Sequence, residues 1–212
     1  MILVLDDEVQ PDYRYLAPEI ARILPESDYH VYAEDTDIPP LDDYDGVVVS
    51  GSTASVYDDS HPWIAEQCDL VEECVERGIP LLGVCFGHQL VNWALGGDVV
   101  GDTRRATFVE MEVLEEDEVL RGIGPVVPVL HADLVTEPGE GMVATARTDY
   151  SENFCTRHES APVWTVQFHP EFTERVADMP SDWDDGDHSF EECNAHEVLT
   201  NFARACEGRV EA

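Results

Sequence analysis

The strongest constraint on the fold is a regular alternation of short apolar runs and helix-like segments in the first half of the chain. The run Gly46–Ser50 (GVVVS) is continuous and β-branched, which is typical of a strand buried on both faces of a sheet. The following segment, His61–Arg77, repeats its apolar residues at helical spacing, and Gly78 stands where a helix commonly ends. This alternation predicts an α/β fold with an open, mostly parallel sheet flanked by helices.

The alternation extends to both sides of this segment and then changes character. The expected strands of the first half are Met1–Leu5, Tyr29–Ala33, Gly46–Ser50 and Ile79–Val84, and the expected helices are Pro11–Leu24, His61–Arg77 and Gly87–Leu95. After Gly97, short runs separated by turn signals indicate a mixed extension of the same sheet. These are Thr107–Leu114, Val126–Leu130, Val143–Ala146, Asn153–Arg157 and Val163–Phe168, and a last helix is expected at Ser189–Cys206. We therefore predict a single domain over residues 1–212.

The charge of the chain limits its partners. The 212 residues include 46 Asp or Glu and 11 Arg but no Lys, which gives a formal net charge of −35. Such a surface repels nucleic acids and anionic lipids, so neither is expected as a partner. Molar salt shortens the Debye length to about 3 Å and would relieve the self-repulsion, so we expect a halophilic source. The alternative is an acidic protein that binds a basic partner.

Targeting signals and cysteine spacing indicate where the chain works. The chain enters its first strand with no basic leader, and no apolar run approaches the roughly 18 residues of a membrane span. Its six cysteines form no CxxC pair, so they are expected to be reduced thiols, mostly in the core. We predict a cytoplasmic protein that does not enter the membrane.

The segment Gly83–Gly87 (GVCFG) is the first candidate for chemistry. It follows an apolar strand and opens a helix, an arrangement in which a sharp turn presents the middle side chain at the edge of the sheet. The glycines suit such a turn because the neighbouring backbone leaves no room for a Cβ. The Cys85 thiol would lie at a helix N-terminus, which favours the thiolate. Read alone, the motif also fits a buried structural cysteine beside a tight turn.

The second candidate segment, VQFHPE, ends another apolar strand with His169 and Glu171. A thiol nucleophile needs an imidazole as proton acceptor, and the imidazole needs a carboxylate to fix its tautomer. Pro170 between them stiffens the turn. A histidine at a strand end is often an ordinary core or surface residue, but this reading becomes the weaker one when the Cys85 segment is considered with it.

GVCFGHQ and VQFHPE, in this order, resemble the motifs of the class I (triad-type) glutamine amidotransferases, and the resemblance covers nearly the whole chain. It implies the flavodoxin-like, mostly parallel fold of that family. It also implies that Cys85 attacks the side-chain amide of glutamine to form a thioester, that His169 is the general base and acid, and that Glu171 orients His169. The products would be glutamate and ammonia.

The resemblance also implies an oxyanion site and a substrate site. The backbone N–H of Phe86 would be one oxyanion donor. The other would come from the loop at Gly51 and Ser52, where Ser52 replaces the second glycine of the family's Ser-Gly-Gly-Pro. The predicted substrate-binding residues are Gly51, Gln89, His131 and Asp133. The last two resemble the Ser-His-x-Asp segment of the guanylate-synthase branch, in which Asp133 would bind the ammonium group of glutamine.

No cofactor or metal is expected, because the chain has no P-loop, GxGxxG or HExxH spacing. The adjacent Arg104 and Arg105 are expected to form solvated ion pairs. We therefore predict a glutaminase that passes ammonia to a separate synthetase, for which the GMP synthase type is the candidate, or a stand-alone relative. Two alternatives stay open: a hydrolase of γ-glutamyl amides or peptides without a synthetase, and a non-catalytic regulatory subunit.

Overall fold

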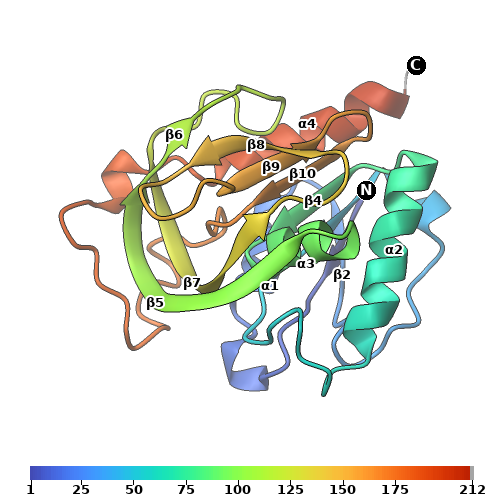
Figure 1. The fold of residues 1–212 in the computed structure, drawn as a ribbon, viewed down its shortest axis with the longest axis horizontal. Coiled ribbons are helices and arrows are strands. Elements are labelled where there is room, and N and C mark those ends of the chain that lie inside the picture. Colours follow the sequence, from blue (N-terminus) through green and yellow to red (C-terminus); the bar gives the residue numbers. More distant parts are fainter. Residues whose placement is uncertain (211–212) are drawn as a thin grey trace.

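Five parallel strands form one continuous part of the sheet in the computed structural model, which describes residues 1–210 (Figure 1). Their spatial order is β2 (Ser27–His30), β1 (Ile2–Leu5), β3 (Gly46–Val49), β4 (Leu81–Val84) and β10 (Val163–Val166). The antiparallel strands β9 (Cys155–His158), β8 (Met142–Arg147) and β6 (Glu112–Val113) extend it beyond β10. The predicted mixed, mostly parallel α/β sheet is confirmed.

Helices cover both faces of this sheet because its central strands are apolar on both sides. Ile2 and Val4 of β1 face one core, whereas Leu3 and Leu5 face the other. The first core includes residues of α1 (Leu16–Ile23) and α4 (Glu197–Val210), and the second includes residues of α2 (Trp63–Arg77) and α3 (Phe86–Ala94). Gly78 ends α2 with a φ of 67°, as the sequence predicted.

A separate antiparallel ribbon is the main departure from the expected fold. The strands β5 (Asp98–Glu110) and β7 (Val126–Glu137) pair only with each other, and β5 is strongly curved (Figure 1). The expected short strands Thr107–Leu114 and Val126–Leu130 were therefore wrong in length and in pairing. The first half of β5 is exposed and polar, so it lacks the alternation that marks a strand.

Several element boundaries also differ from expectation. The first expected helix is a 3-10 turn at Pro11–Tyr13 followed by α1, and the expected strand at Tyr29–Ala33 begins earlier, at Ser27. The expected helix at Ser189–Cys206 is a 3-10 turn at Phe190–Glu192 followed by α4. Between these two elements, Asn194 Oδ1 accepts the N–H of Gly124 and Asn194 Nδ2 donates to Gly122 O, which ties this connection to the segment before β7.

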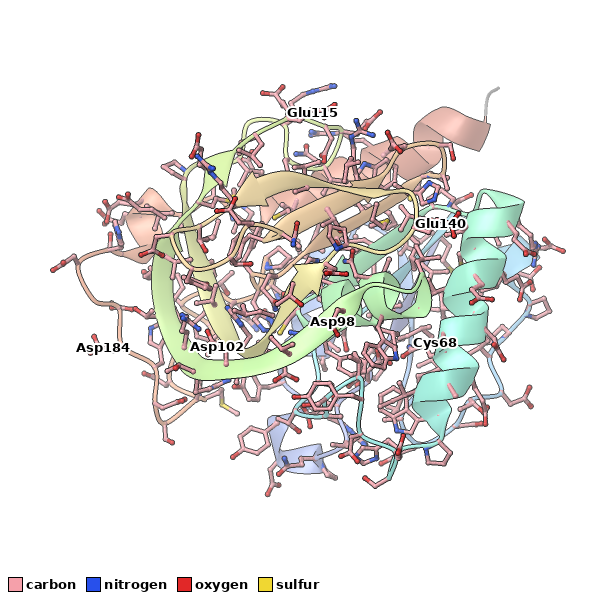
Figure 2. All side chains as sticks on the ribbon, in the orientation of Figure 1. Cys68, Asp98, Asp102, Glu115, Glu140 and Asp184 are labelled. Atoms are coloured by element: carbon pink, nitrogen blue, oxygen red, sulfur yellow. The ribbon has the colours of Figure 1, made fainter. Side chains whose placement is uncertain are left out.

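Many acidic side chains lie on the surface, although a few, such as Asp7 and Glu171, are buried. Asp98 and Asp102 on β5, Glu115 after β6 and Asp184 in a loop are exposed (Figure 2). Four of the six cysteines, at 74, 85, 155 and 206, are buried, as expected. No helix in residues 1–210 is long and apolar enough to cross a membrane. The predicted single domain includes residues 211 and 212, which lie outside the described residues, and it stays a prediction.

Strands β1, β3, β4 and β10 are parallel neighbours, so their carboxyl ends meet at one edge of the sheet. Each is followed there by a segment with polar or reactive side chains. These segments are Asp6–Glu8, Ser50–Thr53, Cys85–Gln89 and Gln167–Glu171. The two motifs of the sequence analysis meet at this edge because Val84 of β4 pairs with Val166 of β10.

Candidate active site

Cys85 stands in a strained turn between β4 and α3. Its φ is 53° and its ψ is −100°, and it is the one non-glycine residue with positive φ in residues 1–210. A Cβ on Gly83 would lie 2.4 Å from the carbonyl oxygen of Gly87, and a Cβ on Gly87 would lie 2.3 Å from that of Val49. Both glycines are therefore required by close backbone approach, and strained backbone of this kind is concentrated at functional sites.

Backbone hydrogen bonds tie this turn to its neighbours. The N–H of Cys85 donates to Val166 O at 2.8 Å, and the N–H of Gly87 donates to Ser50 O at 3.0 Å. The first bond fixes the nucleophile candidate against β10, and the second fixes it against the loop that follows β3. Cys85 is also the N-cap residue of α3, so it stands at the end of the helix where the first backbone N–H groups have no intrahelical acceptor.

His169 and Glu171 form a buried pair beside this turn. His169 Nδ1 lies 2.7 Å from Glu171 Oε1, and both side chains are at most 2% exposed. Because the carboxylate accepts, Nδ1 carries a proton. Burial opposes a charged imidazole, but charge pairing with the Cys85 sulfur and with Glu171 prevails and raises the pKa of His169. His169 Nε2 is buried and makes no hydrogen bond within the described residues, so it is available to a reacting group.

The loop after β3 closes over both side chains. A Cβ on Gly51 would lie 2.8 Å from His169 Cε1 and 3.6 Å from Cys85 Cβ, so only a glycine fits there without displacing the imidazole. Ser52 has a negative φ, and its Oγ accepts the N–H of Ala54 at 3.0 Å. The serine side chain thus stabilises its own loop. The N–H of Phe86, the first residue of α3, has no intrahelical acceptor.

A cleft of about 520 Å³ opens above these residues. It brings together seven of the nine residues that the sequence analysis proposed, namely Gly51, Ser52, Cys85, Gln89, His131, Asp133 and His169. The two others are buried beside it: Phe86 packs against Trp63 with ring centroids 5.7 Å apart, and Glu171 supports His169. The structure therefore places the proposed residues in and around one cleft.

His131 is arranged differently from the expectation that it contacts substrate. Its Nδ1 lies 3.2 Å from Asp133 O and its Nε2 lies 3.1 Å from the hydroxyl of Tyr150, so both ring nitrogens are already engaged. The Gln89 side chain donates to Asp133 O at 3.1 Å and to Gln167 Oε1 at 3.2 Å. The sequence analysis missed Tyr150 and Gln167 as site residues: Tyr150 lies outside both motifs, and Gln167 lies within VQFHPE but was assigned no role.

Acidic residues after β1 form another part of the cleft that the sequence analysis missed. Asp6 and Glu8 line it, and Glu8 accepts the N–H of Thr53 at 2.9 Å and the Thr53 hydroxyl at 2.5 Å. Burial raises the pKa of both carboxyl groups. The signal was present in the sequence, since three acidic residues in a row follow a strand at its carboxyl end.

The adjacent arginines of the sequence analysis, Arg104 and Arg105, form ion pairs with neighbouring aspartates. Arg104 pairs with Asp182 at 3.1 Å and Arg105 with Asp102 at 2.8 Å, which confirms the expected ion pairs. Arg104 and Asp182 also line the cleft. In residues 1–210, no group of three or more His, Cys, Asp or Glu side chains is placed to hold a metal ion.

Comparison with known proteins adds a family to this geometry. Residues 20–180 match the family model "Glutamine amidotransferase class-I". The chain is 40% identical over 135 residues to one subunit of the glutamine-hydrolyzing GMP synthase of Methanosarcina barkeri, a match that covers 62% of each chain. It is 32% identical over 167 residues to the protein of the same name from Methanopyrus kandleri, covering 76% of this chain and 75% of the relative. The first match spans less than two thirds of that relative's length.

Solved structures agree on the fold. A glutamine amidotransferase from Thermotoga maritima superposes with a TM-score of 0.76 at 20% identity, covering 99% of this chain and 97% of the other. A putative GMP synthase subunit from Thermoplasma acidophilum gives 0.75 at 19% identity, covering 99% and 95%. At such low identity these likenesses concern the fold alone.

Proposed function

This chain belongs to the class-I glutamine amidotransferase family, and we propose that it hydrolyses L-glutamine to glutamate and ammonia through a thioester on Cys85. The observation that carries the proposal is the set of three side chains at the carboxyl ends of β4 and β10. Cys85 stands in a turn that only glycines allow, and the imidazole of His169, held by Glu171 at 2.7 Å, turns an unbonded nitrogen into the same site.

In the proposed reaction, His169 Nε2 takes the proton of the Cys85 thiol, and the thiolate attacks the side-chain amide carbon of glutamine. The oxygen of the tetrahedral intermediate accepts hydrogen bonds from the N–H of Phe86 and from the loop at Gly51 and Ser52. His169 then gives its proton to the leaving ammonia, which leaves a glutamyl thioester. A water molecule, deprotonated by His169, hydrolyses the thioester, and glutamate departs with the thiol restored.

The substrate's head group would lie on the opposite side of the cleft. Asp133 offers a carboxylate there, and the amide of Gln89 lies beside it. We assign Asp133 to the ammonium group of glutamine, since a charge-assisted hydrogen bond is the strongest contact available to that group. His131 is assigned to the support of Asp133, because both of its ring nitrogens already have partners.

In this proposal the ammonia passes to a separate synthetase of the GMP synthase type, because relatives at 40% and 32% identity carry the name of a GMP synthase subunit. Exposed apolar side chains next to the cleft suit such docking. They belong to Tyr13, Tyr57, Val100 and Met179, which are 46%, 44%, 39% and 53% exposed. In this proposal the protein is a cytoplasmic, halophilic enzyme without a cofactor of its own.

The test is glutamate release from glutamine in molar KCl by wild type and Cys85→Ala. We expect release that Cys85→Ala reduces by at least about 10³-fold, the scale on which catalytic triad members act. If wild type is silent alone, a thiol-directed glutamine analogue should still label Cys85, which would indicate that a partner activates the chain. Absence of both turnover and labelling would contradict the proposal, and unaided turnover of γ-glutamyl conjugates in preference to glutamine would favour a hydrolase.

A further inference from the structure

Tyr150 lies outside every motif, yet it contacts the side of the cleft that carries Asp133. Its hydroxyl lies 3.1 Å from His131 Nε2, and its ring stacks on the imidazole at 28°, with centroids 5.8 Å apart. The guanidinium of Arg105 lies over the Tyr150 ring, 3.8 Å from its centroid. A cation over an aromatic face is attracted to it, so Arg105 holds the ring in place.

The partners of His131 determine which nitrogen carries its proton. Nδ1 faces the carbonyl oxygen of Asp133 at 3.2 Å, and a carbonyl can only accept, so Nδ1 is the donor. Burial lowers the pKa of His131 to about 4, so the ring is neutral and its Nε2 must accept. Burial also raises the pKa of Tyr150, whose hydroxyl therefore keeps its proton and donates it to Nε2.

This arrangement of His131 holds the main chain at Asp133. Its carbonyl oxygen accepts two hydrogen bonds, from His131 Nδ1 at 3.2 Å and from Gln89 Nε2 at 3.1 Å. Its carboxylate Oδ1 accepts the hydroxyl of Tyr57 at 3.2 Å and lines the cleft. Main chain and side chain are thus fixed separately. If His131 adopted its other tautomer, a lone pair of Nδ1 would face the carbonyl oxygen and the first bond would be lost.

We propose that Tyr150 is a positioning residue: its hydroxyl donates to Nε2, which stabilises the Nδ1–H tautomer of His131 that the Asp133 carbonyl requires, and this holds Asp133 where its carboxylate receives a free α-ammonium group. The inference rests on the proposed glutaminase function and deepens it. It assigns to Tyr150 a share in distinguishing glutamine with a free amino group from glutamine whose amino group is acylated or lies in a peptide bond. Tyr150 and His131 act through Asp133 and touch no reacting atom.

The test is Tyr150→Phe, which keeps the ring, the stacking and the Arg105 contact and removes only the hydroxyl. We expect the KM for glutamine to rise about tenfold with kcat within about twofold, since one hydrogen bond of this kind is lost from substrate positioning. The ratio of kcat/KM for glutamine to kcat/KM for N-acetylglutamine should fall by a similar factor. Tyr44→Phe is the matched control, because it removes an exposed tyrosine–carboxylate bond to Asp28 and should change neither quantity.

Nitrogen-15 NMR of His131 gives a readout that needs no activity. Wild type should show the Nδ1–H tautomer, and Tyr150→Phe should show a mixture. His131→Asn, whose amide nitrogen takes the place of Nδ1, should retain a KM closer to wild type than His131→Leu does. A wild-type KM together with a pure Nδ1–H tautomer in Tyr150→Phe would overturn the proposal. If wild type neither turns over glutamine nor is labelled at Cys85, the proposed function fails. The role of Tyr150 is then decided by the NMR comparison of the His131 tautomer in wild type and Tyr150→Phe.

Discussion

The two sides of the cleft are built by different means. On the Cys85 side, the shape comes from the backbone: Gly83 and Gly87 approach neighbouring carbonyl oxygens so closely that a Cβ would lie within 2.4 Å of them. On the Asp133 side, the shape comes from side chains, with Tyr57, Gln89 and His131 each contributing one hydrogen bond of 3.1 to 3.2 Å. One side is fixed by steric exclusion, and the other by several separate weak bonds.

This difference separates the chemistry from the choice of substrate. Main-chain atoms in direct van der Waals contact leave no room for an added atom or a shifted backbone, so the nucleophile has essentially one position. A hydrogen bond contributes about 0.5 to 1.5 kcal/mol net, so the Asp133 side is adjustable in small steps. We infer that changes on the Cys85 side abolish the reaction, whereas changes on the Asp133 side alter which glutamine derivative is accepted.

The largest effect is expected from Gly87→Ala. The added methyl group would lie 2.3 Å from the carbonyl oxygen of Val49, a main-chain atom at the carboxyl end of β3, one of the central strands of the sheet. We expect a loss of about 3 kcal/mol in the free energy of unfolding, the upper range for overpacking, together with loss of glutamine hydrolysis. Urea unfolding in molar KCl and glutamate release measure the two.

Gly101→Ala is the matched change on the other side of the cleft. Its added methyl group would lie 3.3 Å from the hydroxyl of Tyr57 and 3.7 Å from Asp133 Oδ1, both at the ends of side chains. We expect a change in unfolding free energy within about 0.5 kcal/mol, as for most surface substitutions. Equal losses in the two variants would contradict the distinction between the two sides.

The same distinction explains what the sequence revealed. The Cys85 turn was predictable because all of its requirements are contiguous: a strand, two glycines, a thiol and a helix start within one short run. The pair His169 and Glu171 was predictable for the same reason. The two segments then meet because β4 and β10 are parallel neighbours, a pairing that the sequence analysis did not predict.

The Asp133 side could not be read in this way, because its supports come from distant positions. Tyr150 lies 19 residues beyond His131, in a turn without any motif, and Arg105 reaches its ring from another strand. The sequence therefore suggested His131 as a substrate ligand, whereas its ring nitrogens serve Asp133 and Tyr150. The β5–β7 ribbon was missed in part because exposed strand residues carry no apolar alternation.

The next largest effect on stability is expected at Asp7, which lies behind the loop that follows β3 and bonds Ser50 of that loop. The N–H of Asp7 donates to Ser50 Oγ at 3.0 Å, and its Oδ1 accepts the amide of Gln67 at 2.8 Å. Asp7 Oδ2 and Gln67 Oε1 are buried without a hydrogen-bond partner among the described residues. Burial raises the pKa of Asp7 well above its ordinary value of 3.8. Asp7→Asn would keep the oxygen that accepts the Gln67 amide and would remove the group that can become charged.

The sign of the pH effect follows from this raised pKa. The stability that proton binding gives is present below about pH 3.8 and is lost as the pH rises through the folded pKa. We expect Asp7→Asn to be more stable than wild type at pH 7 and close to wild type at pH 4, because only the wild-type carboxyl group must lose its proton and become charged while buried as the pH rises. Denaturant unfolding at both values measures this.

The surface variant Asp12→Asn should leave the unfolding free energy and its pH dependence unchanged. If Asp7→Asn were destabilising at pH 7, the carboxylate of Asp7 would have to be charged and stabilised by groups that the described contacts do not include. The loop at Ser50 would then be held electrostatically, and the Cys85 side would depend on charge as well as on backbone contact.

The last prediction compares the unfolding free energies of two Cys85 variants to test whether the turn is strained. Cys85→Ala and Cys85→Gly both remove the thiol and should both abolish glutamine hydrolysis. Only glycine adopts a φ of 53° without steric cost, whereas alanine keeps the Cβ that makes this conformation unfavourable. A non-glycine residue held in such a region costs roughly 1 to 3 kcal/mol, which glycine would relieve. Glycine loses part of this relief through its greater freedom in the unfolded chain.

We therefore expect Cys85→Gly to be more stable than Cys85→Ala by about 1 kcal/mol in denaturant unfolding. Equal stability would mean that the turn stores no strain, and that the Cys85 side is fixed by its glycine contacts alone.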